Sequence, residues 1–235
     1  MRARQRHFNP GNIGAVLALD SRFIFGLSDA AQISTWTDRS GRGNNATNSG
    51  SPRPTLQPNQ AAGYPSVKFD GVGNFMIFTG ISAGTDHTSI AVLKLAPNLT
   101  NGFRFGGVLG GDANNIAPLF VSGQDVANMN VGYTITTGGA SVVSINASTN
   151  PWRVCATNRN GTSVNTFVSS QPETTQTLPA NSSANIIHIG RRGVSSPLYY
   201  NSYVSSVVVF APRPSASVYA RIRHLFAYSF KIPCS

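Results

Sequence analysis

Short runs of β-branched and apolar residues recur along this chain, and segments rich in Gly, Pro, Asn and Ser separate them. Runs of this length are typical of strands, while the intervening residues favour tight turns. No long helical pattern alternates with the runs, which argues against a parallel α/β sheet. The pattern therefore predicts a single all-β domain over residues 11–235, built as an antiparallel two-sheet sandwich.

The expected strands are rich in Val, Ile, Phe and Thr, and the glycines of 102–111 permit bulges or close backbone approach. They fall at residues 33–36, 66–71, 75–78, 89–95, 102–111, 118–121, 130–136, 141–145, 153–158, 165–169, 186–190 and 205–210. Two apolar clusters between Ile13 and Phe25, AVLAL and FIFG, indicate a first strand and its return. Residues 40–65 are dense in turn formers, so we expect a long connection there rather than a domain boundary.

One helix is expected near the C-terminus, at about residues 215–230. Ser215 follows Pro214 and suits an N-cap, and Pro233 ends the segment. Apolar side chains recur at helical spacing on one face, at Val218, Ile222, Leu225, Phe226 and Phe230. This face is predicted to pack on the sandwich, with Arg221 and Arg223 directed toward solvent or a neighbouring molecule.

The chain is basic chiefly because it holds few acidic residues: 18 Lys and Arg stand against 8 Asp and Glu, a net charge of +10. A polar but weakly charged surface suits extended contact with a neighbour, because uncharged surface costs less to desolvate. Arginines concentrate in an extended arm over residues 1–10 and in one later pair. We interpret these as candidate partner contacts: Arg2, Arg4, Arg6, Arg191 and Arg192. The absence of a basic stripe interleaved with aromatic residues disfavours nucleic acid as the partner.

No apolar stretch is long enough to span a membrane. The basic N-terminus is not followed by the apolar region of a signal peptide, so the sequence predicts a protein made in the host cytoplasm without a secretion signal. Cys155 and Cys234 are the only cysteines. Two free thiols are favoured in this setting over a disulfide, although a bridge would pin the C-terminus.

Five segments occur in an order that is found in a known group of β-sandwich domains. They are ISTWTDRSGRGNNAT (33–47), YPSVKFDG (64–71), WRVCATNRNGTSVNTFVSS (152–170), IIHIGRR (186–192) and YVSSVVVFAPRPSASVYARIRHLFAYSFKI (203–232). Their order and the closing helix resemble the bacterial and phage branch of the laminin-G/concanavalin-A-like domains. The resemblance implies a jelly-roll sandwich with a binding or structural role more often than an enzymatic one. Many such domains are lectin-like, some hold calcium at the rim, and similar domains occur in phage virion proteins.

Local signals within these segments are explained by folding alone. Trp36 suits a core anchor at the end of a strand. Asp38 is placed to accept backbone N–H bonds from the turn at 40–41. The Asn-Gly-Thr sequence at 160–162 is typical of a hairpin turn.

The carboxylates show no pattern that favours catalysis. Glu173 is the only glutamate and lies in a Thr/Gln/Pro-rich loop. The aspartates fall mostly in predicted turns, at Asp38, Asp70, Asp86, Asp112 and Asp125. A glycosidase needs two carboxylates that face each other across a groove, so we assign no catalytic residues and predict a protein that is not an enzyme.

The four histidines are the remaining candidates for acid–base chemistry. His7 lies in the arm, His87 in a predicted loop, His188 at an outward strand position and His224 on the helix. A Ser/His/Asp triad can assemble from distant positions, but the chain lacks a nucleophile elbow. A structural or solvated role is therefore favoured for each histidine.

A calcium site is the most reasonable metal site, because calcium takes several oxygen ligands. Its candidate ligands are Asp112, Asn114, Asn115 and Asp125. The same residue types are preferred in turns, which is the favoured interpretation, so no metal or other cofactor is assigned.

Tyr199, Tyr200 and Tyr203, beside Asn201, form the best candidate for a glycan-binding patch. Exposed aromatic side chains with amide neighbours suit sugar recognition. The competing interpretation is ordinary strand packing with alternate tyrosines directed inward, and this interpretation is favoured.

These observations predict a non-enzymatic virion structural protein, namely a phage capsid decoration or cement protein that binds the head shell. Its expected partners are other virion proteins, above all the major capsid protein, with the chain present as a homo-oligomer or in many copies on the capsid surface. A polar, Arg-rich surface poor in carboxylates suits broad contact with an acidic shell. The alternative is a glycan-binding, lectin-like module such as a tail adhesin for host-surface attachment, which the fold permits without establishing it.

Overall fold

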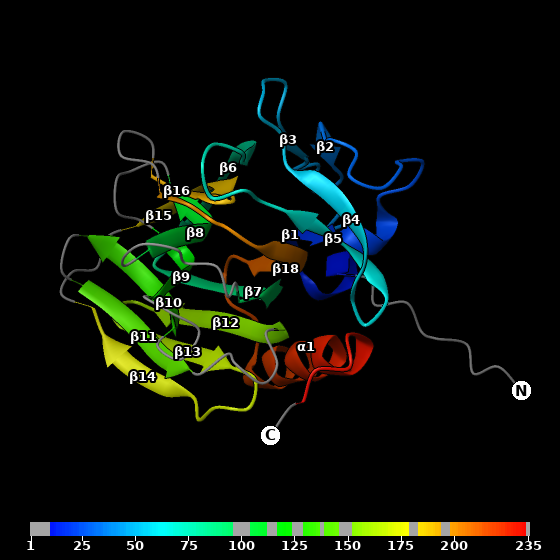
Figure 1. The fold of residues 1–235 in the computed structure, drawn as a ribbon. Coiled ribbons are helices and arrows are strands. Elements are labelled where there is room, and N and C mark those ends of the chain that lie inside the picture. Colours follow the sequence, from blue (N-terminus) through cyan, green and yellow to red (C-terminus); the bar gives the residue numbers. More distant parts are fainter. Residues whose placement is uncertain are drawn as a thin grey trace, which may run out of the picture.

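The computed structural model describes residues 10–95, 104–111, 117–123, 129–136, 139–145, 152–178, 183–193 and 198–233. These residues form a jelly-roll sandwich of two β-sheets with one α-helix against an outer face (Figure 1). The predicted fold class, an all-β antiparallel sandwich with a C-terminal helix, is confirmed.

The first sheet, called sheet A, has the strand order β14-β13-β12-β7-β18-β5-β4, with β1 paired to β18. Its strands are β1 (Ala15–Asp20), β4 (Thr55–Ala61), β5 (Tyr64–Lys68), β7 (Asp86–Lys94), β12 (Trp152–Asn160), β13 (Ser163–Val168), β14 (Thr174–Thr177) and β18 (Tyr203–Phe210). Strands distant in the sequence are adjacent here, because β7 pairs with both β12 and β18.

The second sheet, called sheet B, has the order β11-β10-β9-β8-β15-β6-β3-β2, and the β16–β17 pair joins it through β8. Its strands are β2 (Thr35–Trp36), β3 (Ala46–Thr47), β6 (Met76–Gly84), β8 (Arg104–Gly111), β9 (Ala117–Gly123), β10 (Met129–Thr136), β11 (Gly139–Ile145), β15 (Ala184–Ile189), β16 (Arg191–Arg192) and β17 (Leu198–Tyr199). Among the described residues the contact of β17 with β8 is the one parallel pairing.

The main core fills the space between the two sheets, and a second core lies under the helix. Strand β7 contributes to both, because Ala91 and Leu93 face sheet B while Ile90 and Val92 face outward. A strand buried on both faces reads as a continuous apolar run, which is why 89–95 is a strong strand signal. Trp36 is buried in the main core, as predicted.

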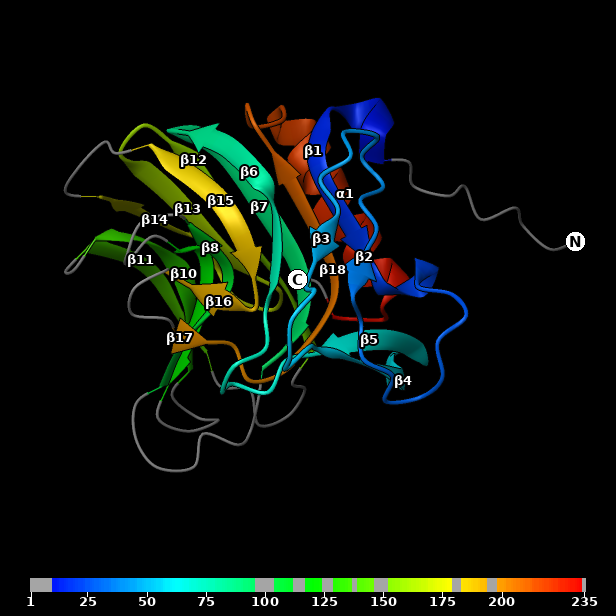
Figure 2. The same ribbon diagram turned by 90° about the horizontal axis from the view of Figure 1, so that it is seen from above.

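Helix α1 (Ala216–Ser229) packs on the outer face of sheet A, the face turned away from sheet B (Figure 2). The Ser215 hydroxyl accepts a hydrogen bond from the Val218 backbone N–H at 3.4 Å, which confirms the predicted N-cap. Ile222 and Phe226 are buried in the second core. Helix α1 therefore covers the apolar part of this outer face and leaves its ends open.

The buried carboxylate of Asp38 ties the loop after β2 to strand β1. It accepts hydrogen bonds from the backbone N–H groups of Ala18, Ser40 and Asn44 at 2.8 to 2.9 Å, and one from the Ser40 hydroxyl at 2.7 Å. The predicted turn role of this aspartate is confirmed, and its contact with β1 extends that role to the tertiary structure. A carboxylate so fully hydrogen-bonded serves folding.

Two local expectations are wrong. The FIFG segment does not form a return strand: Asp20 caps a short 3-10 helix, η2 (Ser21–Phe23), and Phe25 is 77% exposed. The region 40–65 is not one long connection, because β3 and β4 lie within it and β4 pairs with β5. Turn-forming residues at 58–59 hid β4, whose pairing with an apolar neighbour outweighs its own weak propensity.

The glycines of β8 permit the close backbone approach that the sequence indicated. A Cβ atom added at Gly107 would lie 2.5 Å from the backbone nitrogen of Arg192. Strand β16 therefore crosses β8 at a separation that only a residue without a side chain allows.

Candidate functional site

Of the predicted arginine contacts, two lie in the described part of the chain, Arg191 and Arg192. Arg2, Arg4 and Arg6 lie outside the described residues. Arg191 and Arg192 make up β16 and are half-buried. The guanidinium of Arg191 donates to the carbonyl of Gly193 at 2.8 Å and lies 4.3 Å from the ring centroid of Phe75, so this side chain serves local packing.

The three tyrosines of the predicted glycan patch do not face one surface. Tyr200 is buried in the main core, and its hydroxyl donates to the Lys94 carbonyl at 2.6 Å. Tyr199 packs its ring 6.1 Å from that of Phe75 in sheet B. Only Tyr203 lies on the outer face of sheet A, half-buried. The three tyrosines are separated from one another because successive residues of an extended chain point to opposite sides, and Tyr200 turns into the core before β18 begins.

Tyr203 instead belongs to a row of side chains that crosses four strands of sheet A. Trp152 on β12 pairs with Lys94 on β7, and Tyr203 on β18 pairs with Lys68 on β5. Residues in register on neighbouring strands point to the same face. We call Trp152, Lys94, Tyr203 and Lys68 the aromatic–lysine row; Lys68 is exposed and the other three are half-buried.

The contacts within the aromatic–lysine row are consistent with this register. The rings of Trp152 and Tyr203 have centroids 6.4 Å apart at an angle of 51°. The ammonium groups of Lys94 and Lys68 lie 5.0 and 5.9 Å from the Tyr203 ring centroid, within the range of a cation–π contact. Neither lysine makes an ion pair with any carboxylate of the described residues. The row thus offers apolar ring surface beside uncompensated positive charge.

The carboxylates considered for catalysis have structural partners. Glu173 pairs with Arg223 at 2.7 Å and Asp86 with Arg213 at 2.8 Å. The sequence context of Asp86 indicated a turn, but in the structure Asp86 is the first residue of β7.

Asp70 confirms its predicted turn. Burial alone would raise the pKa of its carboxyl, but hydrogen bonds from the backbone N–H groups of residues 72–74 lower it overall. Asp112 and Asp125 lie outside the described residues, as do Asn114 and Asn115 of the calcium prediction.

Two of the four histidines are buried. His87 lies in β7 rather than in a loop, and burial together with the Arg159 charge lowers its pKa to about 4. His188 is buried, yet it stands opposite the exposed Ile77 and next to the core residue Ile189, so it lies on the outer face of sheet B, as its predicted outward position implies. There it packs edge-on against Phe75, with ring centroids 5.6 Å apart. His224 is exposed on α1, and His7 lies outside the described residues.

Cys155 is a buried free thiol, and its burial raises its pKa well above the usual range. Such a thiol is unreactive at neutral pH. Cys234 lies outside the described residues.

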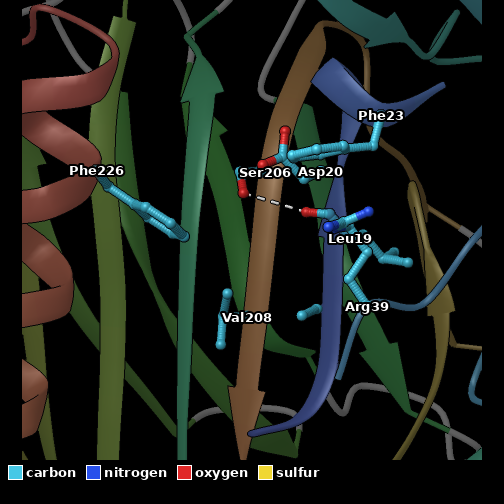
Figure 3. A pocket seen from close by; sticks show the side chains of 8 residues that line it. Leu19, Asp20, Phe23, Arg39, Ser206, Val208 and Phe226 are labelled. Atoms are coloured by element: carbon cyan, nitrogen blue, oxygen red, sulfur yellow. Dashed lines mark hydrogen bonds between the residues drawn. The ribbon is translucent and has the colours of Figure 1, made fainter. Parts of the chain in front are cut away.

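Other classes of site find little support in the part of the chain that the structure describes. No group of three or more His, Cys, Asp or Glu side chains there is placed to hold a metal ion. No helix in those segments is long and apolar enough to cross a membrane. A small cavity between β1, β18 and α1, lined by Leu19, Ser206 and Phe226, holds about 20 Å³, which is the space of one water molecule (Figure 3).

Sequence reasoning identified Tyr203 but missed Trp152, Lys94 and Lys68. A weak signal was present, since Lys94 and Lys68 are charged residues at the ends of otherwise apolar strands, which marks outward positions. Their convergence depends on which strands pair, and local patterns do not contain that information.

No family model and no curated protein matches the chain. Solved structures share its fold at low sequence identity. An arabinofuranosidase complexed with arabinofuranosyl-α-1,2-xylobiose superposes with a TM-score of 0.66 at 12% identity, over 95% of this chain and 65% of that one. A Trypanosoma rangeli sialidase in complex with 2,3-difluorosialic acid gives a TM-score of 0.61 at 17% identity, over 94% of this chain and 34% of that one.

A third similar structure is a single domain. Domain 4 of an extracellular arabinanase from Geobacillus stearothermophilus, in complex with arabinotriose, gives a TM-score of 0.52 at 11% identity, over 89% of this chain and 98% of that domain. The chain spans only 34% of the sialidase chains that it matches. At these identities the likeness shows the β-sandwich fold alone. Because both enzymes and one domain of an enzyme share it, the fold assigns no activity.

Proposed function

We propose that this protein is a carbohydrate-binding module that recognises acidic sugars through the aromatic–lysine row. The observation that carries the proposal is the register of Trp152, Lys94, Tyr203 and Lys68 across adjacent strands. Aromatic rings offer flat apolar surface on which a sugar ring packs, and an ammonium group pairs with a carboxylate or sulfate. This proposal favours the glycan-binding alternative over the virion role.

The row has a size and rigidity that suit an oligosaccharide. Strands in a sheet lie about 4.8 Å apart, so four strands place the outer members of the row roughly 14 Å from each other. Sites built on strands hold their side chains more firmly than sites on loops do. The solved neighbours support the proposal only in that several were crystallised with sugars.

We propose that the aromatic–lysine row binds sugars and does not hydrolyse them. Most glycosidases hydrolyse their substrate with two carboxylates beside the bound sugar. Among the described residues, Glu173 and Asp86 are paired with arginines, and no carboxylate belongs to the row.

A paired glycan panel tests this function. Carboxylated or sulfated oligosaccharides, each matched to an uncharged counterpart, are titrated into the purified chain by calorimetry. We expect the acidic member of at least one pair to bind at least about tenfold tighter, a difference of about 1.4 kcal/mol. Trp152→Ala and Lys94→Gln should each weaken that binding by about tenfold, because one removes stacking area and the other a charge.

The matched control is Tyr228→Ala, which removes a tyrosine on α1 that is 83% exposed and is not a member of the row. This variant should bind like the unmodified chain. Equal affinity for the acidic and uncharged members of every pair, or full binding by Lys94→Gln, would contradict the proposal.

A second proposal keeps the virion structural role, with the major capsid protein as partner and many copies on the capsid surface. Large apolar side chains that are unusually exposed favour protein contact: Phe25 and Val72 at 77% and Tyr228 at 83%. Quantifying the chain on purified particles tests it, together with a deletion of residues 2–7 that should weaken attachment without changing the melting temperature. A chain found free in cells and absent from particles would refute this role.

A further inference from the structure

A second polar region lies on the outer face of sheet A, near the N-terminal end of α1. Thr88, Asn158, Asn165 and Thr175 are paired in register across β7, β12, β13 and β14. The Thr88 hydroxyl donates to Asn158 Oδ1 at 2.9 Å, and the Thr175 hydroxyl donates to Asn165 Oδ1 at 3.0 Å. These bonds orient both amides and leave their NH₂ groups without a partner among the described residues, so each offers two donors.

This region is hollowed into an open groove of about 580 Å³, a volume within the range of small-ligand sites. We call it the amide groove; it is lined by Asp86, Asn158, Asn165, Glu173, Arg213 and Arg223, with Tyr219 of α1 also at its wall. The lining combines amide and guanidinium donors with carboxylate acceptors.

The charges of the amide groove cancel in pairs. Arg213 Nε lies 2.8 Å from Asp86 Oδ1 in an ionic contact, and Arg223 Nη1 donates to Glu173 Oε2 at 2.7 Å. A charged ligand would have to compete with one member of a pair, whereas a neutral hydroxyl can accept from an arginine and donate to a carboxylate while both pairs persist. The groove therefore differs from the aromatic–lysine row, whose lysines are unpaired.

Tyr219 adds an independent observation. Only 5% of the residue is exposed, and among the described residues its hydroxyl makes no hydrogen bond of good geometry; its nearest polar neighbour is the Arg223 guanidinium, 4.3 Å from the ring centroid. A buried hydroxyl without a well-formed hydrogen bond is rare in native proteins and indicates a position that a ligand or water completes.

We propose that the amide groove is a second binding site, distinct from the aromatic–lysine row, and that it takes an uncharged polyhydroxylated ligand of the neutral oligosaccharide class. The amides of Asn158 and Asn165 donate to sugar oxygens, while Asp86 and Glu173 accept from sugar hydroxyls. This inference stands on its own residues and does not depend on acidic sugars binding at the row.

The test is a titration of the isotopically labelled chain with xylotriose, cellotriose and arabinotriose, each followed by NMR to about 20 mM, a concentration that detects millimolar dissociation constants. We expect saturable shifts of the Asn158 and Asn165 side-chain amide signals with at least one sugar. Asn165→Ala should weaken this binding by about fivefold, as expected for one lost hydrogen bond to the ligand.

Three variants separate the two sites and guard against misfolding. Thr177→Ala changes an exposed position on β14 outside the groove and should leave sugar affinity unchanged. Arg213→Gln alters an exposed ion pair, so the fold should persist while affinity falls about threefold to fivefold. Trp152→Ala should weaken acidic-sugar binding by about tenfold yet leave neutral-sugar binding intact.

Two outcomes would overturn the second site. One is the absence of saturable shifts at Asn158 and Asn165 with all three sugars. The other is neutral-sugar binding that Trp152→Ala eliminates and Asn165→Ala does not, which would place neutral sugars on the aromatic–lysine row.

Discussion

Arg159 is fully buried and has no carboxylate partner in the described part of the chain. Its guanidinium donates to the carbonyl of Gly161 and to the hydroxyl of Tyr133, each at 2.8 Å, and one terminal nitrogen has no partner. Burying a cation without hydrogen-bond acceptors is costly, so these two acceptors stabilise the buried charge of Arg159. Arg159 also stands in register with His87, whose imidazole is held neutral by burial and by that charge.

His87 is therefore expected to make stability depend on pH. Its pKa is about 4 in the folded state against 6.5 unfolded, so the unfolded chain binds the extra proton between these values. Stability is then unaffected above pH 6.5 and falls as the pH drops toward 4, by about 3 kcal/mol. Urea unfolding of the unmodified chain and of His87→Gln at pH 4.5, 5.5 and 7 measures this loss.

The His87→Gln variant should show a smaller loss of stability between pH 7 and pH 4.5 than the unmodified chain. His224→Gln, which alters an exposed histidine of α1, serves as the control and should keep the full dependence. If the stability of all three proteins depended on pH in the same way, titratable groups other than His87 would be responsible for that dependence.

At the scale of elements, the crossing of β16 over β8 depends on positions of β8 that have no side chain, Gly107 and Gly110. A Cβ atom at Gly107 would meet the backbone of Arg192 at 2.5 Å, and backbone atoms cannot turn aside as a side chain can. Gly107→Ala should therefore cost about 1–3 kcal/mol of stability, as overpacking of a close contact does. Thermal or denaturant unfolding measures the change.

Gly80→Ala in β6 is the matched control, because the added Cβ would meet only the Cγ2 atom of Ile187 at 3.2 Å. That methyl group can shift, so this variant should lose far less stability. Equal losses at the two glycines would mean that the β8–β16 crossing adapts freely.

At the scale of the whole molecule, α1 divides the outer face of sheet A into two regions of different electrostatic character. The aromatic–lysine row carries unpaired Lys94 and Lys68, whereas the amide groove carries arginines paired with Asp86 and Glu173. Salt screens interactions between exposed charges, with a Debye length that falls from about 10 Å at 0.1 M to about 3 Å at 1 M.

Salt should therefore act differently on the two regions. Between about 0.05 and 0.5 M NaCl, acidic-sugar affinity at the row should fall several-fold, while neutral-sugar affinity at the groove should stay within about twofold. Calorimetry of one acidic and one neutral sugar at both salt concentrations checks this. Parallel losses for the two sugars would contradict a separate neutral site.

Much of the architecture was accessible from the sequence. The run at 89–95, the hairpin turn at 160–162 and the capped helix after Ser215 all depend on residues that are close together in the chain, and all three form as predicted. Errors arose where local patterns were overruled. His188 keeps its outward position but is covered there by Phe75, and the polar segment at 55–61 becomes a strand because β5 pairs with it.

The candidate sites were decided by the tertiary structure. From local pattern, the sequence predicted the strand at 89–95 that carries Lys94 and named Tyr203 among the candidate glycan contacts. The sequence did not predict that Trp152 pairs with Lys94, or that Asn158 pairs with Asn165 near α1. These pairs depend on strand order, which joins segments far apart in the chain. That order follows from burying two apolar faces at once, a property of the whole sandwich rather than of any one strand.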